Sequence, residues 1–268
     1  MTILINGQAE SQIAVNDRGL QYGDGLFETI AIKDGQCQYW SAHMQRLLLG
    51  CEQLAIPAPD LATLQKEAEQ LCVDKEQAIL KIIITRGEGG RGYRYPDQIE
   101  SNRIISIHPW PEYPAINIKQ GIKLHLCTTS LSCQPLLAGI KHLNRLEQVL
   151  ARNEWQDDAI AEGLMSDNSG YIIEGTMSNL FVVINGELLT PTIIDCGVKG
   201  VMRSTVMKLA QTMAITVTEQ AMKLDDIIHA DELFVCNSII GIWPVRSIEG
   251  YNFVAPGKLT TQIMNGLT

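Results

Sequence analysis

Tight-turn dipeptides between short apolar runs constrain the fold of this chain more than any other feature. Asn6-Gly7, Asp34-Gly35 and Asn185-Gly186 each stand between such runs, and residues 166–170 (SDNSG) have the same setting. Asn-Gly and Asp-Gly accommodate the positive φ angles of turns that join antiparallel strands. We therefore expect a β-hairpin at each of these positions, and a further buried strand in the isoleucine-rich run 78–85.

Helical patterns alternate with these turns. Ser41 is placed to cap a helix whose apolar residues recur along one face, and Leu61 begins a second such pattern. A third helix is expected over about 144–155, and a fourth over 202–213 after Gly200. Antiparallel hairpins mixed with helices indicate an α+β fold and not a doubly wound parallel sheet.

A proline-rich stretch divides the chain. Prolines 109, 111 and 114 stand so close together that neither a helix nor a central strand continues through them. We expect a small N-terminal α+β domain over 1–108, a linker over 109–117 and a larger C-terminal domain over 118–268. Both domains have an ordinary size.

The composition narrows the classes of function. Of the 268 residues, 46% are hydrophobic and 19% are charged, which is typical of a globular protein. The formal charge of -9 predicts no nucleic-acid partner, and no apolar run approaches the roughly 18 residues that a membrane helix needs. Seven cysteines without a C-x-x-C pair and five histidines without ligand spacing predict no metal site. We expect a cytoplasmic protein whose reduced thiols have no role.

The segment 87–92 matches the G-x-G-x-x-G pattern of dinucleotide-binding loops, but the helix that follows such loops is missing from the sequence pattern. Such a loop opens a helix whose N-terminus holds the pyrophosphate, whereas the aromatic, proline-containing stretch 93–96 follows here. Two interpretations remain. The segment is either a flexible surface loop or a loop that closes over a ligand and presents Arg91.

Lys141 ends an apolar, glycine-containing segment. A buried lysine loses the hydration of its ammonium form, so its pKa falls and its neutral amine can form a Schiff base or act as a general base. The alternative is a lysine at a helix start with its amine in solvent, and from residue chemistry alone this alternative is the more frequent one.

The chain resembles the fold-type IV pyridoxal-phosphate enzymes, which comprise branched-chain and D-amino-acid aminotransferases and aminodeoxychorismate lyases. The matching segments occur in family order: 17–29 (DRGLQYGDGLFET), 138–149 around Lys141, 174–181 (EGTMSNLF) and 197–203 (GVKGVMR). Within this family, 140–149 (IKHLNRLEQV) and 86–93 (RGEGGRGY) are similar to the 4-amino-4-deoxychorismate lyases. The resemblance implies a two-domain architecture with antiparallel and mixed sheets and the cofactor between the domains.

The resemblance implies pyridoxal 5'-phosphate as the cofactor and assigns residues to it. Lys141 would be the Schiff-base lysine. Glu174 would keep the pyridine nitrogen protonated, so that the ring can draw in electrons. Arg46 matches the phosphate-binding arginine of the family, with a solvated helix charge as the alternative.

The rest of the phosphate site is expected at the start of the fourth helix. Glycines before a helix start leave unpaired backbone N–H groups and a positive dipole end, which suit a phosphate. The amides of Val201 and Met202 are the expected donors. Ser238 stands where the family often presents a hydroxyl or amide to the same phosphate, and a strand-end serine without function is the alternative.

Three substrate positions distinguish a lyase from an aminotransferase. In the D-amino-acid aminotransferases the Arg91 position is also arginine, but the Tyr93 position is histidine and the Phe27 position is tyrosine, and together they bind an α-carboxylate. Phe27 lacks the hydroxyl and Tyr93 replaces the imidazole here. An aromatic pocket with one arginine suits a cyclohexadiene that carries carboxylates.

The resemblance therefore implies conversion of 4-amino-4-deoxychorismate to 4-aminobenzoate and pyruvate, a step of folate biosynthesis. A D-amino-acid or branched-chain aminotransferase is the alternative of the same fold. A non-catalytic small-molecule-binding protein is the alternative of a different class. The resemblance also implies a homodimer in which the loop 86–93 of one subunit completes the site of its neighbour.

Overall fold

The computed structural model describes residues 3–267, and the chain divides into two compact units. The first unit holds the residues up to Pro111 together with Ile140–Asn144. The second unit holds Glu112–Gly139 and the residues from Arg145 onward. Helices and strands occur in both units, so the expected α+β class is confirmed.

The two units differ from the expected domains in the assignment of Lys141. The sequence assigned this residue to the C-terminal domain, whereas Ile140–Asn144 clusters with the first unit. The cause is backbone pairing. Phe27 N donates to the carbonyl oxygen of Lys141 at 2.9 Å, and Leu143 N donates to that of Gly25 at 3.0 Å.

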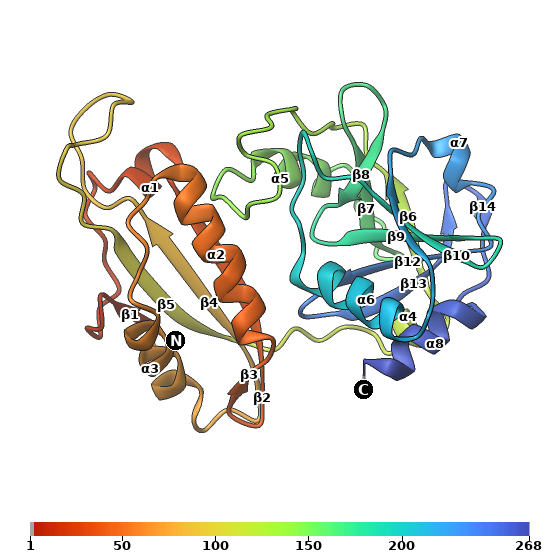
Figure 1. Ribbon diagram of the computed structural model, residues 1–268, viewed down its shortest axis with the longest axis horizontal. Helices are drawn as coiled ribbons and strands as arrows, with labels where there is room; N and C mark the ends of the chain where they lie inside the picture. The colour runs from red at the N-terminus through yellow and green to blue at the C-terminus, as the bar shows by residue number, and fades with distance from the viewer. Residues whose placement is uncertain (1–2, 268) are drawn as a thin grey trace. The chain divides into compact units, whose positions relative to one another are not determined.

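The first unit is a five-stranded antiparallel sheet in the order β1-β5-β4-β2-β3, with two helices along one face (Figure 1). The buried side chains alternate along β4, and helices α2 and α3 each bury one apolar face. Helix α2 contacts β2, and helix α3 contacts β3 and β5. The elements are β1 (Ile3–Ile5), α1 (Arg18–Tyr22), β2 (Gly25–Lys33), β3 (Gln36–Cys37), α2 (Trp40–Leu54), α3 (Leu61–Cys72), β4 (Gln77–Thr85) and β5 (Asn102–Pro109).

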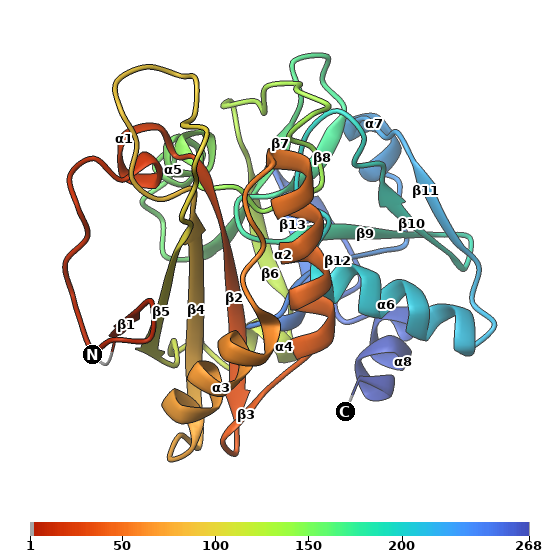
Figure 2. The ribbon, with the colours of Figure 1, turned by 60° about the vertical axis from the view of Figure 1, so that its left-hand side comes forward.

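The second unit is a larger mixed sheet in the order β11-β10-β9-β12-β13-β6-β7-β8, with β14 paired to β13. Helices α6 and α8 lie side by side against it (Figure 2). The elements are α4 (Ile116–Lys119), β6 (Ile122–Leu126), α5 (Leu146–Arg152), β7 (Ile160–Ser166), β8 (Ile172–Gly175), β9 (Asn179–Ile184), β10 (Glu187–Pro191), α6 (Val201–Thr212), β11 (Val217–Gln220), α7 (Leu224–Ile227), β12 (Glu232–Asn237), β13 (Gly241–Ile248), β14 (Tyr251–Asn252) and α8 (Lys258–Gly266).

The central strands of this sheet are apolar on both faces. Leu180 and Val182 of β9 belong to one buried cluster, whereas their neighbours Phe181 and Val183 belong to another that includes residues of α6 and α8. Because successive side chains of a strand point to opposite faces, both faces of β9 are covered. This explains why its sequence, NLFVVI, is continuously apolar after Asn179.

The hairpin prediction is confirmed at three of the four positions. Asp34-Gly35 joins β2 to β3, residues 166–170 join β7 to β8, and Asn185-Gly186 joins β9 to β10. Asn6-Gly7 forms a turn, but only Ile5 and Gln8 pair across it.

Two helix predictions are wrong in detail. Ser41 does not cap α2, because the helix begins at Trp40 and the left-handed Tyr39 (φ 55°) turns the chain into it. The pattern over 144–155 yields only the short α5, in which Leu146 and Leu150 are exposed. Within residues 3–267, the structure contains no helix with the length and apolar character needed to cross a membrane.

Candidate functional site

Lys141 lies beside Phe27 in the first unit. Its Nζ atom is 4.4 Å from the centre of the Phe27 ring, and its carbonyl oxygen accepts the Phe27 amide. Leu26 of β2 also pairs with His142, the residue after Lys141, in an antiparallel bridge. The backbone of strand β2 therefore holds the segment that carries the lysine. The ring gives the amine an apolar neighbour that lacks a hydrogen-bonding group.

Arg46 is held by a buried carboxylate. Its Nε donates to Glu28 Oε1 at 2.8 Å, its Nη2 donates to Glu28 Oε2, and His43 Nδ1 lies 2.7 Å from the same Oε2. Burial alone would raise the pKa of Glu28, but the Arg46 guanidinium and the hydrogen bond with His43 hold that pKa below its usual value. Glu28 therefore stays ionised and orients the guanidinium group of Arg46.

The glycine-rich loop leaves its two predicted substrate residues in solvent. Arg91 is exposed, and so is 87% of Tyr93. The backbone beside them is anchored by Arg18, which donates from Nη1 to the Gly92 carbonyl and from Nη2 to the Tyr93 carbonyl, both at 3.0 Å. Within this unit the structure does not bring Arg91 together with Phe27.

A second charged group supports the base of this loop. Asp24 Oδ2 accepts from Arg18 Nε at 2.9 Å and from Arg86 Nε at 2.7 Å. Burial would raise the pKa of Asp24, but the two guanidinium groups hold that pKa below its ordinary value. No role was predicted from the sequence for Arg18, Asp24 or Arg86, although all three lie in segments that carry the family resemblance.

Glu174, in the second unit, is buried at the end of β8 with a fixed carboxylate. Its Oε2 accepts from Val198 N at 2.9 Å and from Asn179 Nδ2 at 3.2 Å. Gly197 has φ +85°, and a Cβ at this position would come within 2.7 Å of Ile173. The glycine thus lets the chain pass close over the strand that carries Glu174.

The helix α6 begins with its amides available for an anion. Gly200 is its N-cap, and no side chain within residues 3–267 caps the helix. The first amides of a helix have no partner inside it, so those of Val201 and Met202 can serve an anion. Asn179 Oδ1 accepts from Gly200 N at 3.1 Å and so links this helix start to the neighbourhood of Glu174.

Ser238 lies in the turn after β12. Asn237 shapes the turn, because its Oδ1 accepts from Ile239 N at 2.8 Å and from Ile240 N at 2.9 Å. Cys236 is the register partner of Asn179, the residue that bonds Gly200. The end of β12 therefore lies at the same end of the sheet as the start of α6.

Taken each by itself, these groups have the chemistry that a phosphorylated pyridine needs. The first unit offers a lysine and an oriented arginine, and the second offers a buried carboxylate and a helix start suited to a phosphate. Glu28 and His43, which orient Arg46, were not predicted from the sequence. A signal was present, because Glu28 is a charged residue inside an otherwise apolar strand pattern.

Comparison with known proteins points to one family. The family model described as amino-transferase class IV matches residues 25–248. The aminodeoxychorismate lyase of Vibrio harveyi is 38% identical over 267 residues, covering 98% of both chains. A putative branched-chain-amino-acid aminotransferase of Methanocaldococcus jannaschii is 34% identical, covering 98% of this chain and 94% of the relative.

A solved structure agrees with these relatives. The 4-amino-4-deoxychorismate lyase of Pseudomonas aeruginosa superposes with a TM-score of 0.95 at 43% identity, covering 99% of this chain and 97% of that one. The resemblance inferred from the sequence segments is confirmed.

Proposed function

Because the chain belongs to the amino-transferase class IV family, we propose that it is a pyridoxal-phosphate-dependent lyase that converts 4-amino-4-deoxychorismate to 4-aminobenzoate and pyruvate. The observation that carries the choice of lyase over aminotransferase is the contact of Phe27 with Lys141. A phenyl ring 4.4 Å from the amine offers no hydroxyl to an α-carboxylate, and it suits the flat ring of the proposed substrate.

The cofactor roles that the family resemblance assigns are part of the proposal. Lys141 attaches the cofactor, Arg46 and the Val201 and Met202 amides bind its phosphate, and Ser238 adds a hydroxyl. Glu174 pairs with the protonated pyridine nitrogen, and the hydrogen bonds from Val198 and Asn179 keep its carboxylate in one orientation.

Lys141 is also the proposed base of the reaction. Its Nζ removes the proton from C4 of the substrate, and the bound cofactor acts as the electron sink for the charge that this leaves. The enolpyruvyl group leaves C3, and Nζ returns a proton to its methylene carbon. Every atom of the substrate then appears in 4-aminobenzoate or pyruvate, and formation of the aromatic ring supplies the driving force.

A rate comparison tests the proposal. With 4-amino-4-deoxychorismate, pyruvate release coupled to lactate dehydrogenase should show a kcat/KM at least about 100-fold above that for transfer from D-alanine or a branched-chain amino acid to 2-oxoglutarate. A larger kcat/KM for amino transfer would assign the chain to the aminotransferases. The absence of both activities in cofactor-loaded protein would favour a binding protein.

Arg91 is proposed to bind a substrate carboxylate. Arg91→Ala should lower kcat/KM about 30-fold, equivalent to ~2 kcal/mol, because a charged hydrogen-bonding partner is lost. Arg94→Ala is the matched control, since Arg94 lies on the same loop and pairs only with the exposed Asp97 among the ion pairs that the described residues form. Equal kcat/KM values for the two variants would show that Arg91 does not bind the substrate.

The proposed phosphate role of Arg46 requires a variant that leaves no buried unpaired carboxylate. Arg46→Ala in a Glu28→Gln background should raise the Kd of pyridoxal phosphate about 10- to 100-fold over Glu28→Gln alone. Fluorescence titration of the two proteins measures the difference. The same Kd in both would remove Arg46 from the phosphate site.

The proposal includes a homodimer and a cytoplasmic location. An exposed apolar strip on α5, formed by Leu146, Val149 and Leu150, supports the dimer because such a strip is typical of an interface. The free cysteines of the described chain suit a reducing compartment. Leu150→Glu should shift the protein toward monomer in light scattering, and an active wild-type monomer would contradict the dimer.

A further inference from the structure

Two cysteines that are far apart in the sequence meet in the first unit. The Sγ atoms of Cys37 and Cys72 lie 3.4 Å apart and share a hydrogen bond. Cys37 ends β3, a two-residue strand at the edge of the sheet, and Cys72 ends helix α3. The pair therefore links a sheet edge to a helix end, and neither cysteine is among the residues proposed to bind the cofactor.

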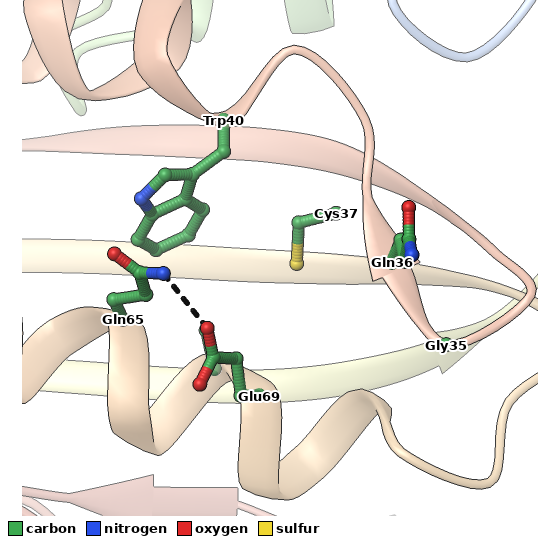
Figure 3. Close-up of a pocket in the computed structure, with 7 residues that line it drawn as sticks. Gly35, Gln36, Cys37, Trp40, Gln65 and Glu69 are labelled. Carbon is green, nitrogen blue, oxygen red and sulfur yellow. Dashed lines mark hydrogen bonds between the residues drawn. The ribbon is translucent and has the colours of Figure 1, made fainter.

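A hollow reaches Cys37 of this pair from outside. It has a volume of about 290 Å³ and is lined by Cys37 together with Trp40, Gln65, Glu69 and the adjoining turn. Figure 3 shows the Cys37 sulfur directed into the space between Trp40 and Glu69. Cys72 is completely buried. Cys37 is therefore the sulfur that a small solute reaches first.

The pair differs from the other buried cysteines. Burial raises the pKa of Cys51 to about 11, and it is the largest cause that raises the pKa values of Cys127, Cys196 and Cys236 to about 12. A hydrogen bond with Cys133 adds to the rise at Cys196, so all four of these buried thiols stay protonated. The hydrogen bond between Cys37 and Cys72 instead lowers the pKa of Cys72 and raises that of Cys37. Proton transfer along this bond can place the negative charge on either sulfur.

We propose that Cys37 and Cys72 are a reversible oxidation site, at which a peroxide entering the hollow closes a disulfide. The sulfurs need to approach from 3.4 Å to about 2.05 Å. Cys37 can supply that movement because β3 is short and pairs with β2 alone among the described strands. The site is independent of the proposed lyase reaction.

The reaction balances with hydrogen peroxide as the oxidant. The thiolate of the pair attacks one peroxide oxygen, the O–O bond breaks and hydroxide leaves, which gives a sulfenic acid. The second thiol attacks the sulfenic sulfur, the S–S bond forms and water leaves. Two thiols lose two electrons, and the peroxide, with the protons released, ends as two molecules of water.

Peptide mapping of the oxidised holoenzyme tests the site. Trypsin separates Cys37 (peptide 34–46), Cys51 (47–66) and Cys72 (67–75), so each thiol is identified without ambiguity. After treatment with hydrogen peroxide, unfolding and alkylation, we expect peptides 34–46 and 67–75 to be joined and to separate on addition of dithiothreitol. The oxidised protein should also melt about 5–10 °C higher than the reduced protein.

Two variants make the test specific. Cys37→Ser should abolish both the linked peptides and the rise in Tm, whereas Cys133→Ser, which removes an exposed thiol of the second unit, should change neither. Full alkylation of Cys37 and Cys72 after peroxide treatment would overturn the proposal. So would linkage of either cysteine to a different one, or irreversible oxidation of Cys37 with Cys72 left free.

Discussion

Substitution of Lys141 by alanine is expected to lower kcat by at least about 10⁴-fold, because the same amine attaches the cofactor and moves the substrate proton in the proposed reaction. The fold should survive. The residue contributes its carbonyl oxygen to the Phe27 amide, and alanine keeps that hydrogen bond. The absorbance band of the lysine-bound cofactor should disappear together with the activity.

The matched control is Lys199→Ala. The Lys199 amide donates to the Gly139 carbonyl at 3.1 Å, and Gly139 stands two residues before Lys141 in the sequence. Lys199 therefore tests whether a different lysine carries the cofactor. Its alanine variant should retain the cofactor absorbance and most of the turnover. Measurable lyase activity in Lys141→Ala, or its loss in Lys199→Ala alone, would contradict the assignment.

Glu174→Gln is expected to have the second largest effect, a fall in kcat of about 10²- to 10³-fold. A glutamine oxygen still accepts from Val198 N, so the loop over the site should remain in place. The amide cannot hold a proton on the pyridine nitrogen, however, so proton removal by Lys141 should become slower. The Kd of the cofactor should change by much less than kcat.

Stopped-flow measurement of proton removal and a titration of the cofactor separate these two effects. Glu162→Gln serves as a control for changes in a buried carboxylate of the same unit, since Glu162 bonds Thr176 and Ser178 in the loop after β8. That variant should lower the Tm and leave kcat nearly unchanged. Normal proton removal in Glu174→Gln would show that Glu174 does not act on the ring.

Local sequence signals predicted the elements whose geometry is local. The Asn185-Gly186 turn has the positive φ angles that its residue types favour, and α3 begins directly after Asp60, whose side chain accepts from Thr63 N. The failure at 144–155 has a different cause. Apolar residues at helical spacing predict burial in the same chain, whereas α5 exposes its apolar side, which the proposed homodimer would cover.

The candidate site shows the same division between local and long-range features. Motifs located the residues that would touch the cofactor, because such residues lie in short continuous segments. The supporting contacts join distant segments, such as Arg86 with Asp24 or Arg18 with the Gly92 carbonyl, and only the folded chain brings them together. Glu28 could have been noticed as a charge within an apolar strand, but its partner Arg46 depends on the packing of α2 over β2.

Borohydride reduction of the cofactor-loaded protein tests the central claim most directly, because it fixes the cofactor to the lysine that carries it. We predict that the pyridoxyl label appears on Lys141, in a tryptic peptide that runs on past this residue because the modified lysine resists cleavage. Parallel reduction in the presence of 4-amino-4-deoxychorismate should leave Lys141 unlabelled, since the substrate amine displaces it. A label on Lys199, or on any other lysine, would contradict the account.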